Sequence, residues 1–335
     1  PESARNEVVA FLEGGVSDLS ISRSTFSWGI PVPWDTKQVV YVWFDALLNY
    51  ATAVGLTDDA QSEGGKKFAK TWPADVHLVG KDILRFHAVI WPAMLMAAGL
   101  PTPKKVFAHG WLLVGGEKMS KSKLTGIAPS DITDHFGVDA FRYYFMRAIP
   151  FGNDGSFSWE DMAARYTSEL ANDFGNLASR LGAMIEKYCD GKVPSRANDS
   201  ALESALISTV KSADAAICAL DFQGGINSIM EFCKTVNGYV TAREPWAVAK
   251  DESRKSELGE ILYNTAEALR ALAVLLHPIM PISTEKLWSS LGAAKDLGAL
   301  SSQRIDGVAR WGQLVPGSAM TKGEILFPRL EEPKP

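Results

Sequence analysis

The chain has few cysteines and no long apolar segment. Cys189, Cys218 and Cys233 are the only cysteines among 335 residues, and their spacing matches neither a Cys-x-x-Cys zinc site nor a disulfide framework. We therefore expect free thiols in a cytoplasmic protein, with no zinc bound to this chain. Because charged residues interrupt its longest apolar stretch, residues 266–280, we also expect no membrane-spanning helix.

An excess of positive charge is also missing. The chain has 34 Lys and Arg against 39 Asp and Glu, a net charge of -5, which excludes bulk attraction to a polyanion such as nucleic acid. Any contact with nucleic acid must therefore be local. The 46% apolar and 22% charged residues are typical of a soluble globular protein and exclude fibrous and disordered classes. The length predicts about two domains.

The first part of the chain alternates short apolar runs with helical patterns. Residues 39–44, 76–79 and 106–108 are predicted strands, because they are rich in β-branched and aromatic residues. Residues 83–98 carry apolar side chains at helical spacing, and Gly99 ends this predicted helix. The alternation predicts a parallel sheet covered by helices.

From Ser158 onward the pattern is helical throughout. A capping box, Ser158-x-x-Asp161, begins one long amphipathic helix that is predicted to end at Gly191. A helical junction is predicted before it, over residues 129–148. Further helices are predicted at 199–220, 224–242, 255–276 and 284–291.

This change of pattern predicts two domains of different class. We place their boundary near residue 155, so that an α/β domain over 1–155 precedes an all-α domain over 156–335. No internal repeat is visible in the sequence. The fold class is therefore α/β followed by all-α.

A short basic segment carries the strongest functional signal. It is Lys118-Met119-Ser120-Lys121-Ser122, which follows the glycine pair 115–116. Two lysines three residues apart, with a hydroxyl group between them, form a cationic loop that suits phosphoryl oxygens. On charge alone a solvated basic turn is the commoner outcome. The string nevertheless resembles the second signature of class I aminoacyl-tRNA synthetases, which implies that Lys118 and Lys121 hold ATP phosphates and stabilise the pyrophosphate leaving group.

A second motif lies where a predicted strand enters a helix, as nucleotide sites in open α/β sheets do. Gly80 allows close approach of the backbone. The carboxylate of Asp82 can accept hydrogen bonds from ribose hydroxyls, although helix capping explains it equally well. His87 suits a structural imidazole somewhat better than a ligand contact when only spacing is considered. The segment from Gly80 to Leu95 belongs to the same resemblance.

An aromatic stretch at residues 41–50 can line an apolar slot for an unbranched thioether, because rings contact polarizable sulfur favourably. Core packing is the default role of any one of these aromatics. Together with the Gly80 motif, and with residues 21–23 and 28–33, this stretch resembles the methionyl-tRNA synthetase family. The resemblance implies that L-methionine is surrounded by Trp43, Ala46, Leu47, Tyr50, Ile83, His87 and Trp91.

The same resemblance assigns the other contacts of the catalytic site. It places the ribose against Gly80 and Asp82, and the adenine against the backbone of Trp111 and Leu112. It gives Arg23 a part in activating the substrates. ATP and Mg²⁺ are the implied cofactors, and no metal-ligand set is visible in the sequence.

Two segments of the helical half are similar to the surface on which that family reads the CAU anticodon. Asn176 and Arg180 are four residues apart, so they share a helix face that can contact base edges. Pro245 and Trp246 follow Glu244, and the indole offers a stacking surface for an unstacked base. Alone, each signal is weak, because a surface pair and a core tryptophan are the commoner explanations. The resemblance implies tRNA(Met) as a partner.

The chain also differs from the family pattern. The first class I signature, a His-x-Gly-His-type tetrapeptide, does not occur, and neither does the zinc-bearing insertion. We therefore expect a fragment: the C-terminal half of a Rossmann-type nucleotide-binding domain plus an α-helical anticodon-binding bundle, with the N-terminal part of the catalytic domain as a required partner. The usual glycine after KMSKS stands later, at Gly126, which leaves the exit of that loop undefined.

Three hypotheses follow. The first is a methionine–tRNA ligase fragment, which activates methionine with ATP and transfers it to tRNA(Met) when the N-terminal half is present. The second is a catalytically inactive tRNA-binding module, if this chain acts alone. The third is another class I synthetase, for leucine, isoleucine, valine or cysteine, which would share the phosphate loop. The aromatic stretch and the pairing of Asn176 and Arg180 with Pro245 and Trp246 favour methionine.

Overall fold

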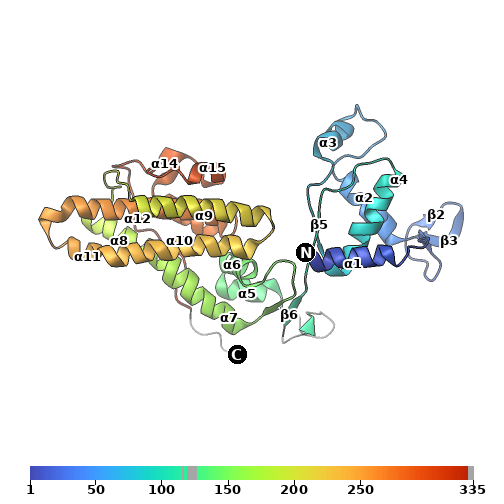
Figure 1. The fold of residues 1–335 in the computed structure, drawn as a ribbon, viewed down its shortest axis with the longest axis horizontal. Coiled ribbons are helices and arrows are strands. Elements are labelled where there is room, and N and C mark those ends of the chain that lie inside the picture. The colour runs from blue at the N-terminus through green and yellow to red at the C-terminus, as the bar shows by residue number, and fades with distance from the viewer. Residues whose placement is uncertain (115–116, 119–126, 331–335) are drawn as a thin grey trace. The chain divides into compact units, whose positions relative to one another are not determined.

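The computed structural model describes residues 1–114, 117–118 and 127–330. Two compact units make up the chain, Pro1–Trp111 and Leu112–Pro335 (Figure 1). Lys121 and the centre of the basic segment lie outside the described residues, and only the backbone of Lys118 is described. The boundary predicted near residue 155 divides a catalytic domain from an anticodon-binding domain. The two compact units carry no such assignment of roles, so this boundary stays a prediction.

Two small sheets and several helices form the first unit. Helix α1 (Glu2–Glu13) precedes an antiparallel sheet in which β3 (Asp35–Val40) lies between β1 (Ser22–Arg23) and β2 (Pro31–Val32). Strand β4 (His77–Gly80) pairs in parallel with β5 (Val106–His109), so the two predicted strands at 76–79 and 106–108 are confirmed. Helices α2 (Val42–Thr52) and α3 (Glu63–Thr71) precede β4.

The predicted strand at 39–44 is wrong beyond its first two residues. Strand β3 ends at Val40, and α2 begins at Val42. A short apolar run has no periodicity that separates a strand from a buried helix. Here the helix is favoured because it buries Leu47 and Ala51, four residues apart, on one face.

The predicted helix at 83–98 is confirmed as helical but is not regular. It consists of a 3₁₀ turn over Lys81–Ile83, a π-helical turn over Phe86–Ile90 and α4 (Trp91–Ala97). Pro92 explains part of this geometry, because it has no N–H to donate to the preceding turn, and its ring crowds an α-helical carbonyl. Gly99, with φ +68°, follows the helix end as predicted.

The second unit begins with a small sheet. Strand β6 (Leu112–Val114) lies between β7 (Glu117–Lys118), with which it is antiparallel, and β8 (Gly155–Phe157), with which it is parallel. The predicted junction at 129–148 is two helices, α5 (Pro129–Phe136) and α6 (Val138–Ala148). Gly137, with φ +83°, separates them.

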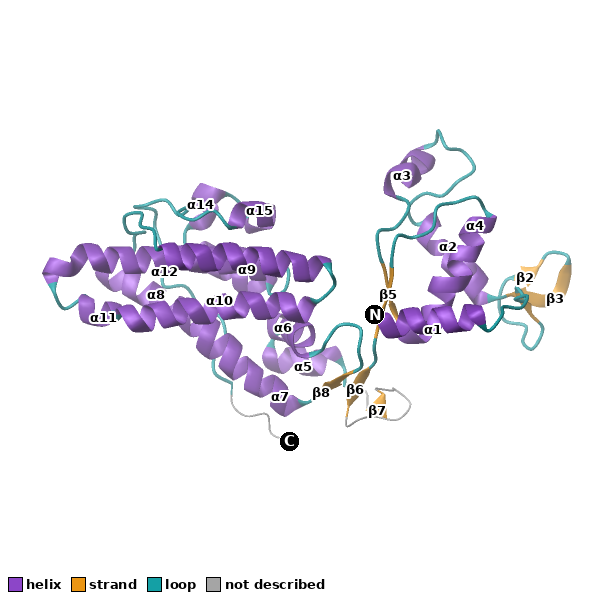
Figure 2. Cartoon of the chain, viewed as in Figure 1, coloured by secondary structure: helices purple, strands orange, loops and turns teal. Residues whose placement is uncertain are grey.

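The bundle that follows matches the sequence pattern closely. The predicted long helix consists of α7 (Trp159–Arg165), a π-helical segment (Tyr166–Gly175) and α8 (Asn176–Tyr188). The other main helices are α9 (Ser200–Cys218), α10 (Phe222–Arg243) and α12 (Lys255–Leu276), all labelled in Figure 2, and α13 (Pro281–Ser290). Shorter helices are α11 (Pro245–Val248), α14 (Ala293–Leu297) and α15 (Ile305–Val308). Helix α13 begins at a proline, three residues before the predicted start.

Side-chain caps explain where several of these helices begin. The Ser158 hydroxyl accepts from the Asp161 amide at 3.1 Å, as the capping box predicts. Asp199 and Asp221 cap α9 and α10 in the same way. No helix of the described ranges is both long enough and apolar enough to span a bilayer.

A buried ion pair fixes the C-terminal segment on α12. Glu267 and Arg270 are 0% and 1% exposed, with Arg270 Nε 2.7 Å from Glu267 Oε1. Arg270 also donates to the carbonyl of Val308 at 2.9 Å. The carboxylate of Glu267 accepts from the amides of Gln313 and Leu314, at 3.1 and 3.0 Å. Both oxygens of the Glu267 carboxylate are therefore hydrogen-bonded inside this core.

Removing one member of this pair should strongly destabilise the second unit. In Arg270→Leu the Glu267 carboxylate stays buried without its cation, and we expect a loss of about 3–5 kcal/mol in the free energy of unfolding. Denaturant unfolding followed by circular dichroism measures it. Lys286→Leu, which breaks the exposed pair of Lys286 with Glu324, is the matched control and should leave stability near the wild-type value. Equal stability of the two variants would contradict the structural role.

Candidate functional site

Five of the seven residues predicted to surround methionine lie in one cluster of side chains in the first unit. Helix α2 supplies three of them, the π-helical turn one and α4 one; we call them the aromatic cluster: Trp43, Leu47, Tyr50, His87 and Trp91. Ala46 and Ile83 are half-buried on α2 and in the 3₁₀ turn. The fold thus brings together predicted residues that precede β4 in the sequence and predicted residues that follow it.

Ring contacts hold the aromatic cluster together. Trp43 stacks on Phe86 with centroids 4.3 Å apart, and its edge faces His87 at 6.1 Å. Tyr50 contacts the rings of His87 and Trp91 at 5.5 and 6.3 Å. Leu47 and Trp91 are fully buried, whereas Trp43 and Tyr50 keep part of their surface exposed. The cluster therefore has a buried base and a partly accessible aromatic side.

Hydrogen bonds orient the polar atoms of this cluster. His87 Nδ1 lies 2.9 Å from the carbonyl oxygen of Ile83, which can only accept, so Nδ1 carries a proton. In the neutral ring, Nε2 then accepts from the Tyr50 hydroxyl at 2.8 Å. Burial raises the pKa of Tyr50, which keeps the phenol protonated as this bond requires.

Sequence reasoning missed two residues that complete the cluster. His77, at the start of β4, is 6% exposed and accepts a hydrogen bond from Trp91 Nε1 at 3.2 Å. Trp72 packs edge-on against Trp91 at 6.0 Å, and its own Nε1 donates to the carbonyl of Pro101 at 2.8 Å. A titratable residue inside a predicted buried strand is the signal that would have singled out His77.

The residues predicted to contact the ribose, Gly80 and Asp82, lie at the carboxyl end of β4. Trp111, predicted to contact the adenine through its backbone, follows β5. A Cβ on Gly80 would stand 2.7 Å from Asp82 Oδ1, so only glycine leaves this carboxylate its position. The Lys81 ammonium lies 4.0 Å from the centroid of the Trp111 ring. Leu112 is the first residue of β6 in the second unit.

An open pocket of about 480 Å³ adjoins Asp82 in the first unit. Its lining combines one aromatic side with charged groups: Glu7, Phe11, Leu19, Tyr41, Lys81, Asp82, Arg85, Phe86 and Ile90. Phe86 also stacks on Trp43, so a ring that lines this pocket contacts the aromatic cluster. Such a mixture of apolar wall and convergent polar groups is typical of a small-molecule site.

Arg23 lies beside this pocket and not in the aromatic cluster. Its guanidinium is 3.5 Å from the centroid of the Tyr41 ring, and it donates to the carbonyls of Ser20 and Ser22 at 3.0 and 2.8 Å. Tyr41 in turn contacts Phe86, with ring centroids 6.5 Å apart. Stacking on an aromatic face holds the cation in one place while leaving charge available to an anion.

The predicted anticodon residues come together in the second unit. The Arg180 guanidinium, on α8, lies 5.1 Å from the ring centroid of Trp246 on α11. Trp246 is 38% exposed and Pro245 is buried. Asn176 is exposed one turn before Arg180 on the same helix. Glu244, with φ 43°, turns the chain between α10 and α11 and so brings the indole to this surface.

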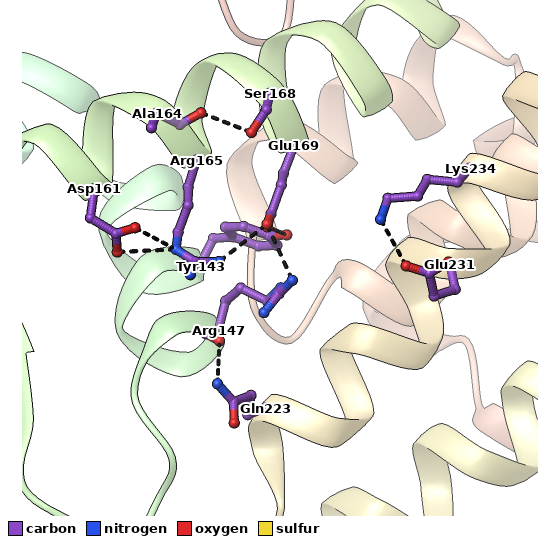
Figure 3. A network of polar contacts seen from close by, with 10 residues as sticks. All are labelled: Tyr143, Arg147, Asp161, Ala164, Arg165, Ser168, Glu169, Gln223, Glu231 and Lys234. Atoms are coloured by element: carbon purple, nitrogen blue, oxygen red, sulfur yellow. Dashed lines mark hydrogen bonds and ion pairs between the residues drawn. The ribbon is translucent and has the colours of Figure 1, made fainter.

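A polar network fixes the helix that carries Asn176 and Arg180 (Figure 3). Glu169, in the π-helical segment, accepts from the Tyr143 hydroxyl and from Arg147 and Arg165, both at 3.2 Å. Arg165 also pairs with Asp161 at 3.1 Å. Burial, and then the charge of Glu169, raise the pKa of Tyr143. The network thus ties α6 to the helix that continues into α8.

In the part of the chain that the structure describes, no group of three or more His, Cys, Asp or Glu side chains is placed to hold a metal ion.

Two family models match this chain. Residues 1–182 match "tRNA synthetases class I (M)", and residues 199–305 match "Anticodon-binding domain of tRNA ligase". The two models describe a class I catalytic domain followed by an anticodon-binding domain. The predicted fold class, α/β followed by all-α, is therefore confirmed.

Individual relatives show to which family of class I tRNA synthetases the chain belongs. The methionine–tRNA ligases of Streptomyces coelicolor and Caldanaerobacter subterraneus are 64% and 47% identical over 99% and 100% of this chain. The crystal structure of Mycobacterium tuberculosis methionyl-tRNA synthetase bound by methionyl-adenylate covers 98% of the chain, with a TM-score of 0.86 and 37% identity. The chain belongs to the methionyl-tRNA synthetase family, and the predicted resemblance is confirmed. It spans 62% and 51% of the two ligases and 64% of the M. tuberculosis chain.

Neutralising the central carboxylate of the network in Figure 3 should destabilise the second unit. Glu169→Gln keeps the shape but leaves the half-buried guanidinium of Arg147 without an anion and Arg165 with Asp161 alone, and we expect the free energy of unfolding to fall by about 1–3 kcal/mol. Thermal unfolding of the variant tests this. Glu231→Gln, in the exposed pair with Lys234, is the matched control and should change little. A Glu169→Gln protein as stable as wild type would contradict the structural role.

Proposed function

We propose that this chain is the part of a methionine–tRNA ligase that binds the methionine side chain, contacts ATP and reads the anticodon of tRNA(Met). The enzyme joins L-methionine to the AMP part of ATP, releasing pyrophosphate, and then transfers methionine to the 3′ end of the tRNA, releasing AMP. The observation that carries the proposal is the aromatic cluster with its Tyr50–His87 hydrogen bond, in a chain of this family. The M. tuberculosis relative is described as bound by methionyl-adenylate.

The aromatic cluster accounts for the amino-acid specificity. A methionine side chain is unbranched and apolar, and its sulfur packs favourably against aromatic rings such as the partly exposed Trp43 and Tyr50. Buried Leu47 forms the base, and the Tyr50–His87 pair supplies a fixed polar edge. Because both polar atoms of this pair are already hydrogen-bonded to each other, an apolar side chain leaves neither of them unsatisfied.

The first chemical step needs orientation and charge rather than a covalent intermediate on the protein. A methionine carboxylate oxygen attacks the α-phosphorus of ATP, and the bond from that phosphorus to the oxygen bridging to the β-phosphorus breaks. Gly80 and Asp82 would hold the ribose, and the backbone of Trp111 and Leu112 the adenine. Arg23, Lys118 and Lys121 would stabilise the negative charge on phosphates and on the leaving pyrophosphate.

Two further participants belong to the proposal. Mg²⁺ would enter with the triphosphate and neutralise part of the triphosphate charge. The roles proposed above for the side chains of this chain do not include holding the ion. The relatives are longer than this chain, and we propose that activity requires the N-terminal part of the catalytic domain as well.

The second unit would identify the tRNA. Trp246 offers an exposed indole on which an unstacked base can lie, and Arg180, held beside that ring, can contact a base edge or phosphate. Asn176 adds an exposed amide on the same helix face. A local site of this kind agrees with the net negative charge of the chain, because it needs no broad basic surface.

Methionine-dependent ATP–pyrophosphate exchange tests the catalytic proposal. In the intact enzyme, Lys121→Ala should reduce exchange by about 10²-fold or more, because the cation that we propose stabilises the leaving pyrophosphate is lost. Lys123→Ala, a neighbouring lysine outside the signature, is the matched control and should keep most of the activity. Near-normal exchange in Lys121→Ala would contradict the phosphate role. Exchange by this chain alone would contradict both the inactive-module hypothesis and the need for the N-terminal part.

Aminoacylation kinetics test the anticodon proposal. Trp246→Leu removes the stacking surface, and we expect KM for tRNA with a CAU anticodon to rise about tenfold or more, with ATP–pyrophosphate exchange unchanged. A tRNA whose anticodon is altered should be a poor substrate of the wild-type enzyme and should lose little further in the variant. Indifference of the wild-type enzyme to the anticodon would contradict the assignment.

A further inference from the structure

His77 has no part in the substrate contacts proposed above, yet it touches three residues of the aromatic cluster. Its ring centroid lies 4.4 Å from that of Tyr50 and 6.2 Å from that of His87. Its Nε2 accepts a hydrogen bond from Trp91 Nε1 at 3.2 Å. With 6% of its surface exposed, it lies behind the cluster and not on its accessible side.

The partner of His77 determines which of its nitrogens is protonated. An indole N–H can only donate, so His77 Nε2 must offer its lone pair, and the neutral ring carries its proton on Nδ1. Burial and the neighbouring His87 lower the pKa of His77, which keeps the ring neutral near pH 7. Two imidazoles with defined tautomers therefore contact the ring of Tyr50.

The bond to His77 restricts how Trp91 can lie. Trp91 is fully buried, so an indole turned away from His77 would leave its N–H without an acceptor. The torsion that turns an aromatic ring is broad by itself, and packing or hydrogen bonds must select one orientation. Trp72, whose own N–H is bonded to Pro101, packs against Trp91 but offers it no acceptor.

We propose that His77 is a positioning residue for amino-acid selection: its Nε2 fixes the buried indole of Trp91, which contacts the ring of Tyr50, and so fixes the accessible aromatic side of the cluster on which the methionine thioether packs. This inference rests on the proposed function. Because His77 acts through Trp91, it affects the fit of the amino-acid side chain and leaves the binding of ATP alone. It also affects discrimination against ethionine, the thioether one methylene longer, because a fixed ring rejects extra length better than a mobile one.

Exchange kinetics of the intact enzyme test the proposal. His77→Leu removes the acceptor at similar volume, and we expect KM for methionine to rise about tenfold, or 1.4 kcal/mol, with KM for ATP within about twofold. The preference for methionine over ethionine, measured as a ratio of kcat/KM values, should fall by a similar factor. His77→Gln, whose side-chain oxygen supplies an acceptor near the ε position, should restore most of both losses.

Phe68→Leu is the matched control, because it removes a ring from the same apolar core, where Phe68 stacks on Trp72 at 5.8 Å, but keeps the His77–Trp91 bond. Its KM for methionine should stay near wild type. Equal effects of Phe68→Leu and His77→Leu, or a Gln variant as impaired as Leu, would overturn the positioning role. Absence of methionine-dependent exchange in the wild-type enzyme would remove the proposed function instead, so the two failures are distinguishable.

The tautomer of His77 can also be measured directly, in the wild-type enzyme. In ¹⁵N spectra of the histidine-labelled wild-type enzyme, His77 should show a protonated Nδ1 and an unprotonated Nε2 near pH 7, with the resonance assigned by its loss in His77→Gln. A protonated Nε2 is incompatible with the bond to Trp91 and would overturn the proposal.

Discussion

Burial of the Trp91 indole is the constraint on which the first unit depends. An indole that lies fully inside the protein needs apolar neighbours for its rings and an acceptor for its N–H. Helix α2 and Trp72 supply the neighbours, and β4 supplies the acceptor, His77. Strand, helix and turn are therefore held together around one side chain, and Tyr50 and His87 are placed as a result.

Buried and half-buried carboxylates have the corresponding part in the second unit. Glu169 joins α6 to the long helix, and Glu267 joins α12 to the C-terminal segment. Asp139, on α6, accepts from the backbone amides that begin α13. In each case a charge brought out of water is satisfied by groups from distant parts of the chain, so it specifies which elements meet. Hydrophobic packing alone is less selective, because apolar faces fit many partners.

The sequence predicted the helical half of the fold better than the first half. Amphipathic periodicity over many residues identifies long helices, and the cap at Ser158 marks a start, so those elements were confirmed. The short run at 39–44 has no such periodicity, and the three-residue strand β8 carries no local signal at all. Proximity of Arg180 to Trp246 came from family resemblance, since no local pattern links residues so far apart. His77 was missed because its importance arises only when α4 packs on β4.

The π-helical turn at Phe86–Ile90 has a consequence for the orientation of α4. A π turn contains one residue more than an α turn, and each residue of an α-helix advances the side chains by about 100°. Loss of a single residue here would leave a straighter helix but would rotate Trp91 and all of α4 away from α2. The number of residues in this turn therefore sets which face of α4 meets α2, independently of which side chains occupy it.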